Sequence, residues 1–167
     1  MSINDIDLEP ILYKPIGIIH TPFKGQGGVP FQPWMGKDIE GVIELDPKFK
    51  DGLKDLEGFS HIYVLFHMHL IKDYHLRVTP AWDSKEHGLF TTRSPRRPNP
   101  IGLSLVRIKR VIFDEAKIEI IDVDMIDESP LIDIKPYIPF FNPPEEHVRV
   151  GWFETCKDRI LKKMSKE

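Results

Sequence analysis

The sequence predicts a mainly β fold, a barrel or a sandwich, and three observations support that prediction. Apolar and polar residues alternate in short runs, most clearly over residues 59–70, which is the pattern of half-buried strands. The chain holds 15 prolines and 11 glycines, residues that favour turns between short strands. Helical signals are confined to two segments, near 47–56 and near 143–164, which disfavours an α/β fold.

The composition is ordinary for a soluble globular protein. The chain has 167 residues, a net charge of −3 and 41% apolar residues, so we expect a flexible arm over 1–10 and a single domain over 11–167. The lone cysteine, Cys156, permits no disulfide within the chain and favours the reducing cytoplasm. No long apolar run or signal-like N-terminus is present, so neither a membrane span nor export is expected. Because the chain is mildly acidic, an RNA partner would require a local basic surface.

The first half of the chain begins with two predicted strands and a short helix. Residues 13–20 form the first strand, a loop rich in glycine and proline follows over 21–35, and residues 41–45 form the second strand. Asp46 is suited to be a helix N-cap before Pro47, which predicts one or two helical turns that end near residue 56.

The run 59–70 is the strongest predicted strand. Alternation divides it into a core face, with Ile62, Val64, Phe66, Met68 and Leu70, and an opposite face, with His61, Tyr63, Leu65, His67 and His69. The three histidines raise the hypothesis of a metal-dependent hydrolase. No acidic or cysteine ligand follows at a recognisable spacing, and histidines satisfied by neighbouring groups are more common, so we predict no metal site.

The second half contains a predicted hairpin, formed by residues 102–113 and 116–125 around a tight polar link. The core face of the first run is expected to comprise Ser104, Val106, Ile108, Arg110 and Ile112. An acidic corner follows, which we interpret as solvated turn residues: Asp122, Asp124, Asp127, Glu128 and Asp133.

Residues 131–139 are predicted to be extended, and a C-terminal helix is predicted over 143–164. Asn142 is a capping residue with proline after it. The helix would carry an apolar stripe formed by Val148, Trp152, Cys156, Ile160 and Met164. Its exposed Trp152 would serve a dimer contact or cover one end of the β structure.

We refer to the stretch 90–104, FTTRSPRRPNPIGLS, as the proline–arginine segment. Proline fixes φ and favours extended geometry in the preceding residue, so the segment is predicted to be stiff and extended. Its arginines, Arg93, Arg96 and Arg97, carry guanidinium groups that match the geometry of carboxylates and phosphates. The segment therefore either recognises an anion or is a connection with solvated arginines.

The string TRSPRRPNPIG within this segment resembles the signature of the TsaA-like (TrmO-type) family of S-adenosylmethionine-dependent tRNA methyltransferases. Three further stretches resemble that family: 17–24 with Gln32-Pro33, 53–69 and 127–139. The resemblance implies a small closed β-barrel of mostly antiparallel strands, a homodimer, and methylation of tRNA. The implied target is the N6 amine of the threonylcarbamoyl-adenosine next to the anticodon.

The resemblance also implies a set of site residues. Those expected to bind S-adenosylmethionine are Gln32, Pro33, Trp34, His69, Leu70, Arg93, Leu103, Asp127, Glu128, Ser129, Pro130 and Leu131. The departing proton needs an acceptor, for which Asp127 is the first candidate and His69 the second. The residues expected to contact RNA phosphates are Arg96, Arg97, Lys109 and Arg110.

One departure from the family pattern leaves an alternative open. The family usually has glycine in the turn where this chain has Glu128, and a positive φ strains any residue except glycine. Either this turn uses ordinary dihedral angles or its geometry differs. The alternative function is a module that binds S-adenosylmethionine as a regulator or scaffold and methylates no tRNA.

Overall fold

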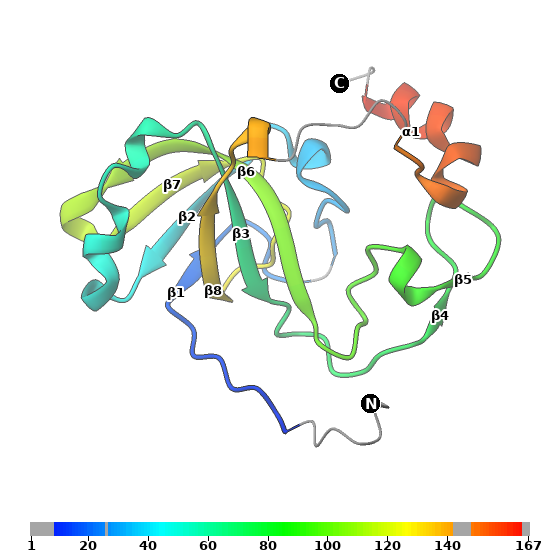
Figure 1. Ribbon diagram of the computed structural model, residues 1–167, viewed down its shortest axis with the longest axis horizontal. Coiled ribbons are helices and arrows are strands. Elements are labelled where there is room, and N and C mark those ends of the chain that lie inside the picture. The colour runs from blue at the N-terminus through cyan, green and yellow to red at the C-terminus, as the bar shows by residue number, and fades with distance from the viewer. Residues whose placement is uncertain (1–8, 26, 142–147, 165–167) are drawn as a thin grey trace.

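The computed structural model describes residues 9–25, 27–141 and 148–164 (Figure 1). Within these residues, six strands close into an antiparallel barrel with the order β1-β2-β7-β6-β3-β8. The strands are β1 (Gly17–His20), β2 (Glu40–Leu45), β3 (His61–His67), β6 (Ile101–Ile112), β7 (Lys117–Ile121) and β8 (Ser129–Pro136). The mainly β prediction and the closed barrel implied by the family resemblance are therefore confirmed.

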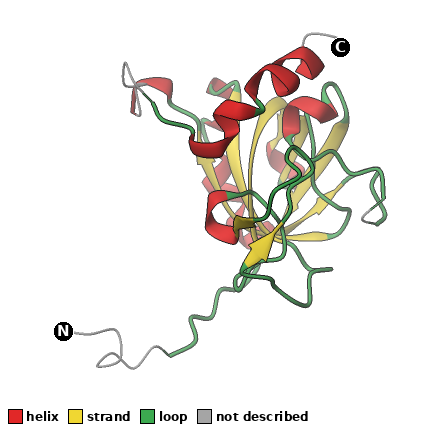
Figure 2. Cartoon of the chain, turned by 90° about the vertical axis from the view of Figure 1, so that its right-hand side faces the viewer, coloured by secondary structure: helices red, strands yellow, loops and turns green. Residues whose placement is uncertain are grey.

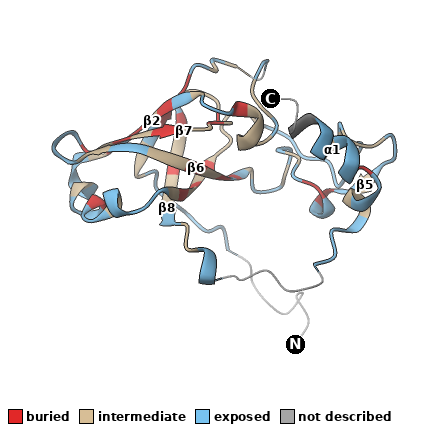
Figure 3. Cartoon of the chain, turned by 90° about the horizontal axis from the view of Figure 1, so that it is seen from above, coloured by how far each residue is buried: buried red, intermediate tan, exposed pale blue. Residues whose placement is uncertain are grey.

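Alternate residues of the strands fill the barrel with apolar side chains, because period-2 alternation sends them to its inner side. Each of the six barrel strands contributes at least one fully buried residue, and these residues are Ile19, Ile43, Ile62, Val64, Val106, Ile118, Ile120 and Leu131. In the view from above, buried positions concentrate in the barrel, whereas the surrounding loops and helices are mostly exposed (Figure 3). Burial of this apolar surface is the main stabilisation of the fold.

The predicted long strand over 59–70 is shorter in the structure. Ile62, Val64 and Phe66 of β3 are buried as predicted, and Met68 packs against the core from its edge. The strand ends at His67, and the amide of Ile71 donates to the carbonyl of Met68 across a turn. Leu70 therefore lies in that turn and is 39% exposed, so the prediction that it belongs to the core face was wrong.

The hairpin of β6 and β7 is confirmed, but the alternation along β6 changes phase. Ser104 and Val106 are buried as predicted. The pairing with β7 shifts between Ile108 and Arg110, as a β-bulge does when it adds one residue to a strand. Beyond the bulge Val111 packs against the core, whereas Arg110 pairs with Glu119 at the surface, which corrects the prediction for Arg110.

The short helix predicted near 47–56 forms as two 3₁₀ segments, Pro47–Leu53 and Leu56–Gly58. The predicted cap is present, because the Asp46 side chain accepts a hydrogen bond of 3.1 Å from the amide of Lys48. Further 3₁₀ turns lie at Pro33–Gly36, Leu89–Thr91, Phe113–Glu115 and Pro139–Phe141.

The predicted C-terminal helix is divided. A 3₁₀ turn spans Gly151–Thr155, and α1 follows at Lys157–Met164. Residues 148–150 are not helical, and Gly151 has a φ of +60°. Right-handed helices require a negative φ, so no helix can run through Gly151. The predicted helix start at Asn142, like most of the predicted arm over 1–10, lies outside the described residues. None of the described helices combines the length and hydrophobicity that crossing a bilayer requires.

The C-terminal segment packs beside the barrel, against a lobe formed by residues 74–91 (Figures 1 and 2). This lobe contains a two-stranded sheet of β4 (Arg77–Val78) and β5 (His87–Gly88). The Trp152 indole stacks on the His87 ring at 4.3 Å and donates to the carbonyl of Thr91. Arg159 donates to the carbonyl of Trp82. The C-terminal helix therefore covers this lobe rather than an end of the barrel.

The turn between β7 and β8 settles the question that Glu128 raised. Glu128 has a φ of +61°, so this turn keeps the left-handed geometry that glycine adopts without strain. The conformation costs a residue with a Cβ about 1–2 kcal/mol. The turn therefore does not use ordinary dihedral angles, and Glu128 is strained in the left-handed region.

We expect Glu128→Gly to raise the free energy of unfolding by about 0.5–1 kcal/mol, because relief of the strain exceeds the entropic cost of glycine. Urea unfolding measures the change. Glu57→Gly is the control, since Glu57 lies in a 3₁₀ segment without a positive φ. The free energy of unfolding of that variant should fall by about 0.5–1 kcal/mol. A fall in both variants would contradict the strain at Glu128.

Candidate functional site

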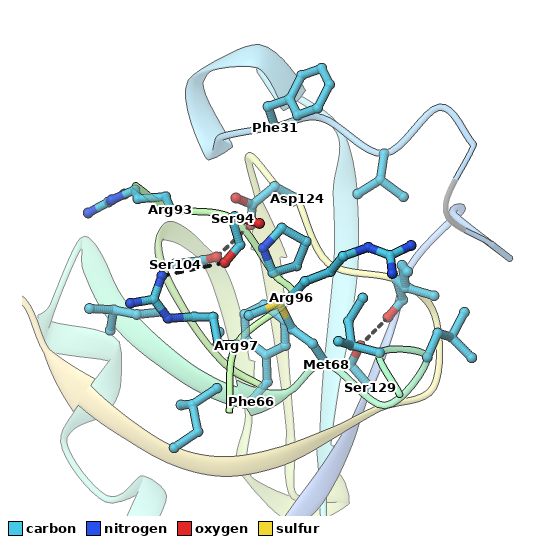
Figure 4. Close-up of a pocket in the computed structure, with 18 of the residues that line it drawn as sticks. Phe31, Phe66, Met68, Arg93, Ser94, Arg96, Arg97, Ser104, Asp124 and Ser129 are labelled. Carbon is cyan, nitrogen blue, oxygen red and sulfur yellow. Dashed lines mark hydrogen bonds between the residues drawn. The ribbon is translucent and has the colours of Figure 1, made fainter. Parts of the chain in front are cut away.

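One side of the barrel opens into a cavity of about 480 Å³ (Figure 4). Its walls come from five separate stretches: 29–32, 66–71, 92–97, 101–104 and 124–129. Cavities of about 300–1,000 Å³ hold small organic ligands and cofactors. The proline–arginine segment contributes two of these stretches, so it forms a wall of the cavity.

Side-chain hydrogen bonds fix the proline–arginine segment in addition to its prolines. The Thr92 hydroxyl donates to the carbonyl of Leu89 at 2.8 Å and accepts from the amide of Ser94 at 3.2 Å. The Arg97 guanidinium donates to the carbonyl of Thr92 at 3.1 Å. These contacts order the segment before any ligand binds, which lowers the entropic cost of binding.

Two arginines of this wall form no hydrogen bond or ion pair with a carboxylate among the described residues. Arg93 donates to the side-chain oxygen of Gln32 at 2.8 Å, which joins two predicted site residues that are distant in the sequence. Arg97 bonds to backbone carbonyls and lies over the ring of Phe90. Arg96, by contrast, donates to both carboxylate oxygens of Asp73. The charges of Arg93 and Arg97 therefore remain available for an anionic group of a ligand.

Asp124 faces the same cavity and is the residue that sequence reasoning misjudged. It follows β7 in an irregular stretch, between the buried residues Val123 and Met125, and its own side chain lines the cavity. The Ser104 hydroxyl donates to Asp124 Oδ1 at 2.5 Å, and Figure 4 shows this contact beside Ser94. Burial raises the pKa of Asp124 to about 6, although the Ser104 hydrogen bond and the charge of Arg93 oppose this increase.

His69 lines the cavity and has one unsatisfied ring nitrogen. Its Nδ1 atom is buried and has no hydrogen-bond partner among the described residues. A buried polar atom without a partner costs about 1–3 kcal/mol. Because His69 itself lines the cavity, the residue is a candidate polar contact for a ligand.

Asp127 does not line the cavity. Its carboxylate accepts hydrogen bonds from the amide of Thr21 at 2.9 Å and from Lys24 Nζ at 2.6 Å. The hydrogen bond from Lys24, followed by that from Thr21, lowers the pKa of Asp127. The Asp127 amide also donates to the carbonyl of Phe23. Asp127 therefore ties the loop after β1 to the turn before β8.

The other predicted residues divide between the cavity and the rest of the molecule. Those in the cavity wall are Gln32, His69, Leu70, Arg93, Arg96, Arg97, Leu103 and Ser129. Those outside the wall are Pro33, Trp34, Glu128, Pro130, Leu131, Lys109 and Arg110. Leu131 is a core residue of the barrel. Lys109 and Arg110 pair with Glu40 and Glu119 and lie about 30 Å along β6 from Ile101 at the cavity.

The described residues contain no group of three or more histidine, cysteine, aspartate or glutamate side chains placed to hold a metal ion. His61 bonds to the neighbouring Ser60 hydroxyl at 2.8 Å and contacts the ring of Tyr137 edge-on. The hypothesis of a three-histidine hydrolase therefore has no site in this part of the chain.

Residues 18–142 match the family model of the tRNA-methyltransferase O N-terminal domain. The chain is 50% identical to a probable S-adenosyl-L-methionine-binding protein of Pyrococcus abyssi, over 91% of this chain and 81% of that protein. It is 37% identical to the tRNA (adenine(37)-N6)-methyltransferase of Escherichia coli, over 77% of this chain and 58% of that enzyme. A crystal structure of TrmO superposes with a TM-score of 0.72 and 31% identity, over 88% of this chain and 64% of that one.

Proposed function

The chain belongs to the family of the tRNA-methyltransferase O N-terminal domain, and we propose that it methylates the N6 amine of adenine 37 in tRNA with S-adenosylmethionine. The relatives whose names specify this reaction are longer than the matched region, since the chain spans 58% of the Escherichia coli enzyme. The observation that carries the proposal is the cavity, which lies within the matched region and combines free cationic, polar and apolar groups.

The residues of the cavity suit S-adenosylmethionine. Its volume of about 480 Å³ is in the range for a nucleoside cofactor. Arg93 would bind the carboxylate of the methionine part, because it has a neutral partner in Gln32. His69 Nδ1, which lacks a partner among the described residues, would bond to a polar edge of the cofactor. When bound, the cofactor supplies an electrophilic methyl group on a sulfonium.

The apolar part of the wall would hold the adenine ring and exclude water. Phe66, Met68 and Leu103 line this part, and aromatic and sulfur-containing side chains are well suited to contact an aromatic ring. Ser129 also lines the cavity. A second group of predicted residues lies just outside the wall and would act indirectly, by holding wall stretches 29–32 and 124–129 in place. These residues are Pro33, Trp34, Asp127, Glu128, Pro130 and Leu131.

The RNA would approach along the proline–arginine segment. Arg97 forms no ion pair among the described residues and would contact a phosphate, whereas Arg96 would first have to release Asp73. Lys109 and Arg110 are neutralised by glutamates, so we propose a smaller role for them. The proposal includes a homodimer and a cytoplasmic location, and the exposed rings of Phe140 and Phe141 are apolar surface available to a second subunit.

The finer proposal is that the substrate adenosine already bears a threonylcarbamoyl group. The test uses radiolabelled S-adenosylmethionine with two pools of tRNA, one carrying and one lacking this modification. We expect label only in the first pool, with N6-methylated threonylcarbamoyl-adenosine recovered after digestion to nucleosides. Equal labelling of both pools would support adenine-N6 methylation but refute the requirement for the threonylcarbamoyl group. Tight cofactor binding with no label in either pool would support the regulatory module instead.

Arg93→Ala is expected to weaken cofactor binding about 10–100-fold, because a charge-assisted hydrogen bond contributes about 1.5–3 kcal/mol. Isothermal titration calorimetry with S-adenosylmethionine measures the effect. Arg110→Ala is the matched control, since Arg110 pairs with Glu119 on a distant part of β6, and its affinity should equal that of the wild type. Unchanged affinity in Arg93→Ala would remove Arg93 from the proposed site.

A further inference from the structure

Asp124 has no role in the cofactor contacts proposed above, yet it occupies the cavity. It is the only carboxylate among the described residues that line the wall. A carboxylate would repel the carboxylate of the methionine part of the cofactor, and burial of an ionisable group costs stability that a structural role does not explain. The buried carboxylate of Asp124 in the cavity therefore indicates a chemical function for this residue.

The geometry distinguishes Asp124 from Asp127, the first candidate for the proton acceptor. Asp127 lies outside the cavity wall, and its oxygens accept hydrogen bonds from Thr21 and Lys24. The Asp124 carboxylate accepts from the Ser104 hydroxyl at Oδ1 and also interacts with its own backbone amide. Among the described residues no side chain donates to its other oxygen, which we therefore expect to meet a substrate group in the cavity.

We propose that Asp124 is the proton acceptor for methyl transfer, held in position by Ser104; this inference rests on the proposed function. The adenine N6 nitrogen forms a bond to the methyl carbon while the methyl–sulfur bond breaks, and sulfur keeps the bonding pair as a neutral thioether. One proton leaves the N6 nitrogen for the free oxygen of Asp124, which becomes a neutral carboxylic acid and later releases the proton to water. Asp124 is thus a catalytic residue and Ser104 a positioning residue.

The electrostatics of the site agree with this role. A base works best when its pKa is close to the working pH, and the pKa of Asp124 is raised to about 6. The other titratable or charged groups that face the cavity are His69, Arg93, Arg96 and Arg97. Of these, Arg93 acts on Asp124 through its charge and favours the ionised form. Asp124 is therefore mostly ionised above pH 6 and able to accept a proton there.

The test is the pH dependence of kcat with saturating tRNA and S-adenosylmethionine. For the wild type, kcat should rise about tenfold per pH unit below pH 6 and become constant above it. For Asp124→Asn, kcat should fall about 10²–10⁴-fold and lose the rise that ends near pH 6. For Ser104→Ala the rise should move to higher pH, because loss of the hydrogen bond raises the pKa of Asp124 further.

Calorimetry and circular dichroism separate this role from cofactor binding and folding. Asp124→Asn should fold like the wild type and bind S-adenosylmethionine within about threefold of wild-type affinity. A kcat within twofold of wild type, or a retained rise near pH 6, would overturn the role of Asp124. Weaker cofactor binding with unchanged kcat would also overturn it and make Asp124 a cofactor ligand. A wild-type protein that methylates no tRNA would refute the proposed function itself, and the inference with it.

Discussion

Asp124→Asn is expected to be more stable than the wild type above pH 6, by as much as about 3 kcal/mol. Burial raises the pKa of Asp124 from its ordinary value of 3.8 to about 6, and each unit corresponds to about 1.4 kcal/mol. The folded protein holds the proton of Asp124 more tightly than the unfolded chain does. The free-energy cost of burying the ionised carboxylate is therefore absent below pH 4. It grows between pH 4 and pH 6 and is complete above pH 6. Asparagine carries no charge and keeps an oxygen that accepts from Ser104.

Urea unfolding of both proteins at pH 4 and pH 7.5 measures this difference. The variant should gain stability over the wild type at pH 7.5 and little at pH 4, where Asp124 is already neutral. Asp133→Asn is the control, because Asp133 forms a surface pair with Lys135, and removal of such a pair changes stability by less than about 1 kcal/mol. An equal gain of Asp124→Asn at both pH values would show that charge burial is not its cause. A gain in stability with a loss of kcat would mark Asp124 as a residue kept for chemistry.

Local patterns in the sequence predicted the barrel well. Alternation identified the buried residues Ile62, Val64 and Phe66 of β3, and the Asp46 cap was found from two adjacent residues. The errors occurred where a distant contact decides the outcome. The bulge that exposes Arg110 depends on pairing with β7, and Leu70 leaves the core because β3 ends at a turn.

The site was predictable only in part, because five stretches of the chain build it. The proline–arginine segment identified one wall through its composition, and Arg93 and Gln32 do meet in the structure. Asp124 and Asp127 are both aspartates of one acidic corner, and the sequence offers no way to tell which faces the cavity. The difference arises from Thr21 and Lys24, which hold Asp127, and from Ser104 on β6, which holds Asp124. The one local signal was the position of Asp124 between two apolar residues.

Gly102→Ala is expected to lower the affinity for S-adenosylmethionine at least tenfold. Gly102 lies opposite Phe66 in the pairing of β3 with β6. A Cβ atom at Gly102 would lie 2.2 Å from Cζ of the Phe66 ring, which is far closer than two carbon atoms can approach. The Phe66 ring is 6% exposed and lies between the core and the cavity. Since the core is close-packed, the ring would have to move into the cavity and occupy cofactor space.

Calorimetry and urea unfolding of three variants test this explanation. Gly102→Ala should lose about 1–3 kcal/mol of stability, which is typical of overpacking, together with the cofactor affinity. Gly52→Ala is the control, since a Cβ atom there meets nothing within 4 Å, and its affinity should be that of the wild type. In the double variant Gly102→Ala/Phe66→Leu, the smaller side chain removes the clash, so the affinity should rise above that of Gly102→Ala. It should stay below that of the wild type, because the contact of the Phe66 ring with the ligand is also lost. An affinity in the double variant below that of Gly102→Ala would show that the displaced ring is not what blocks the cofactor.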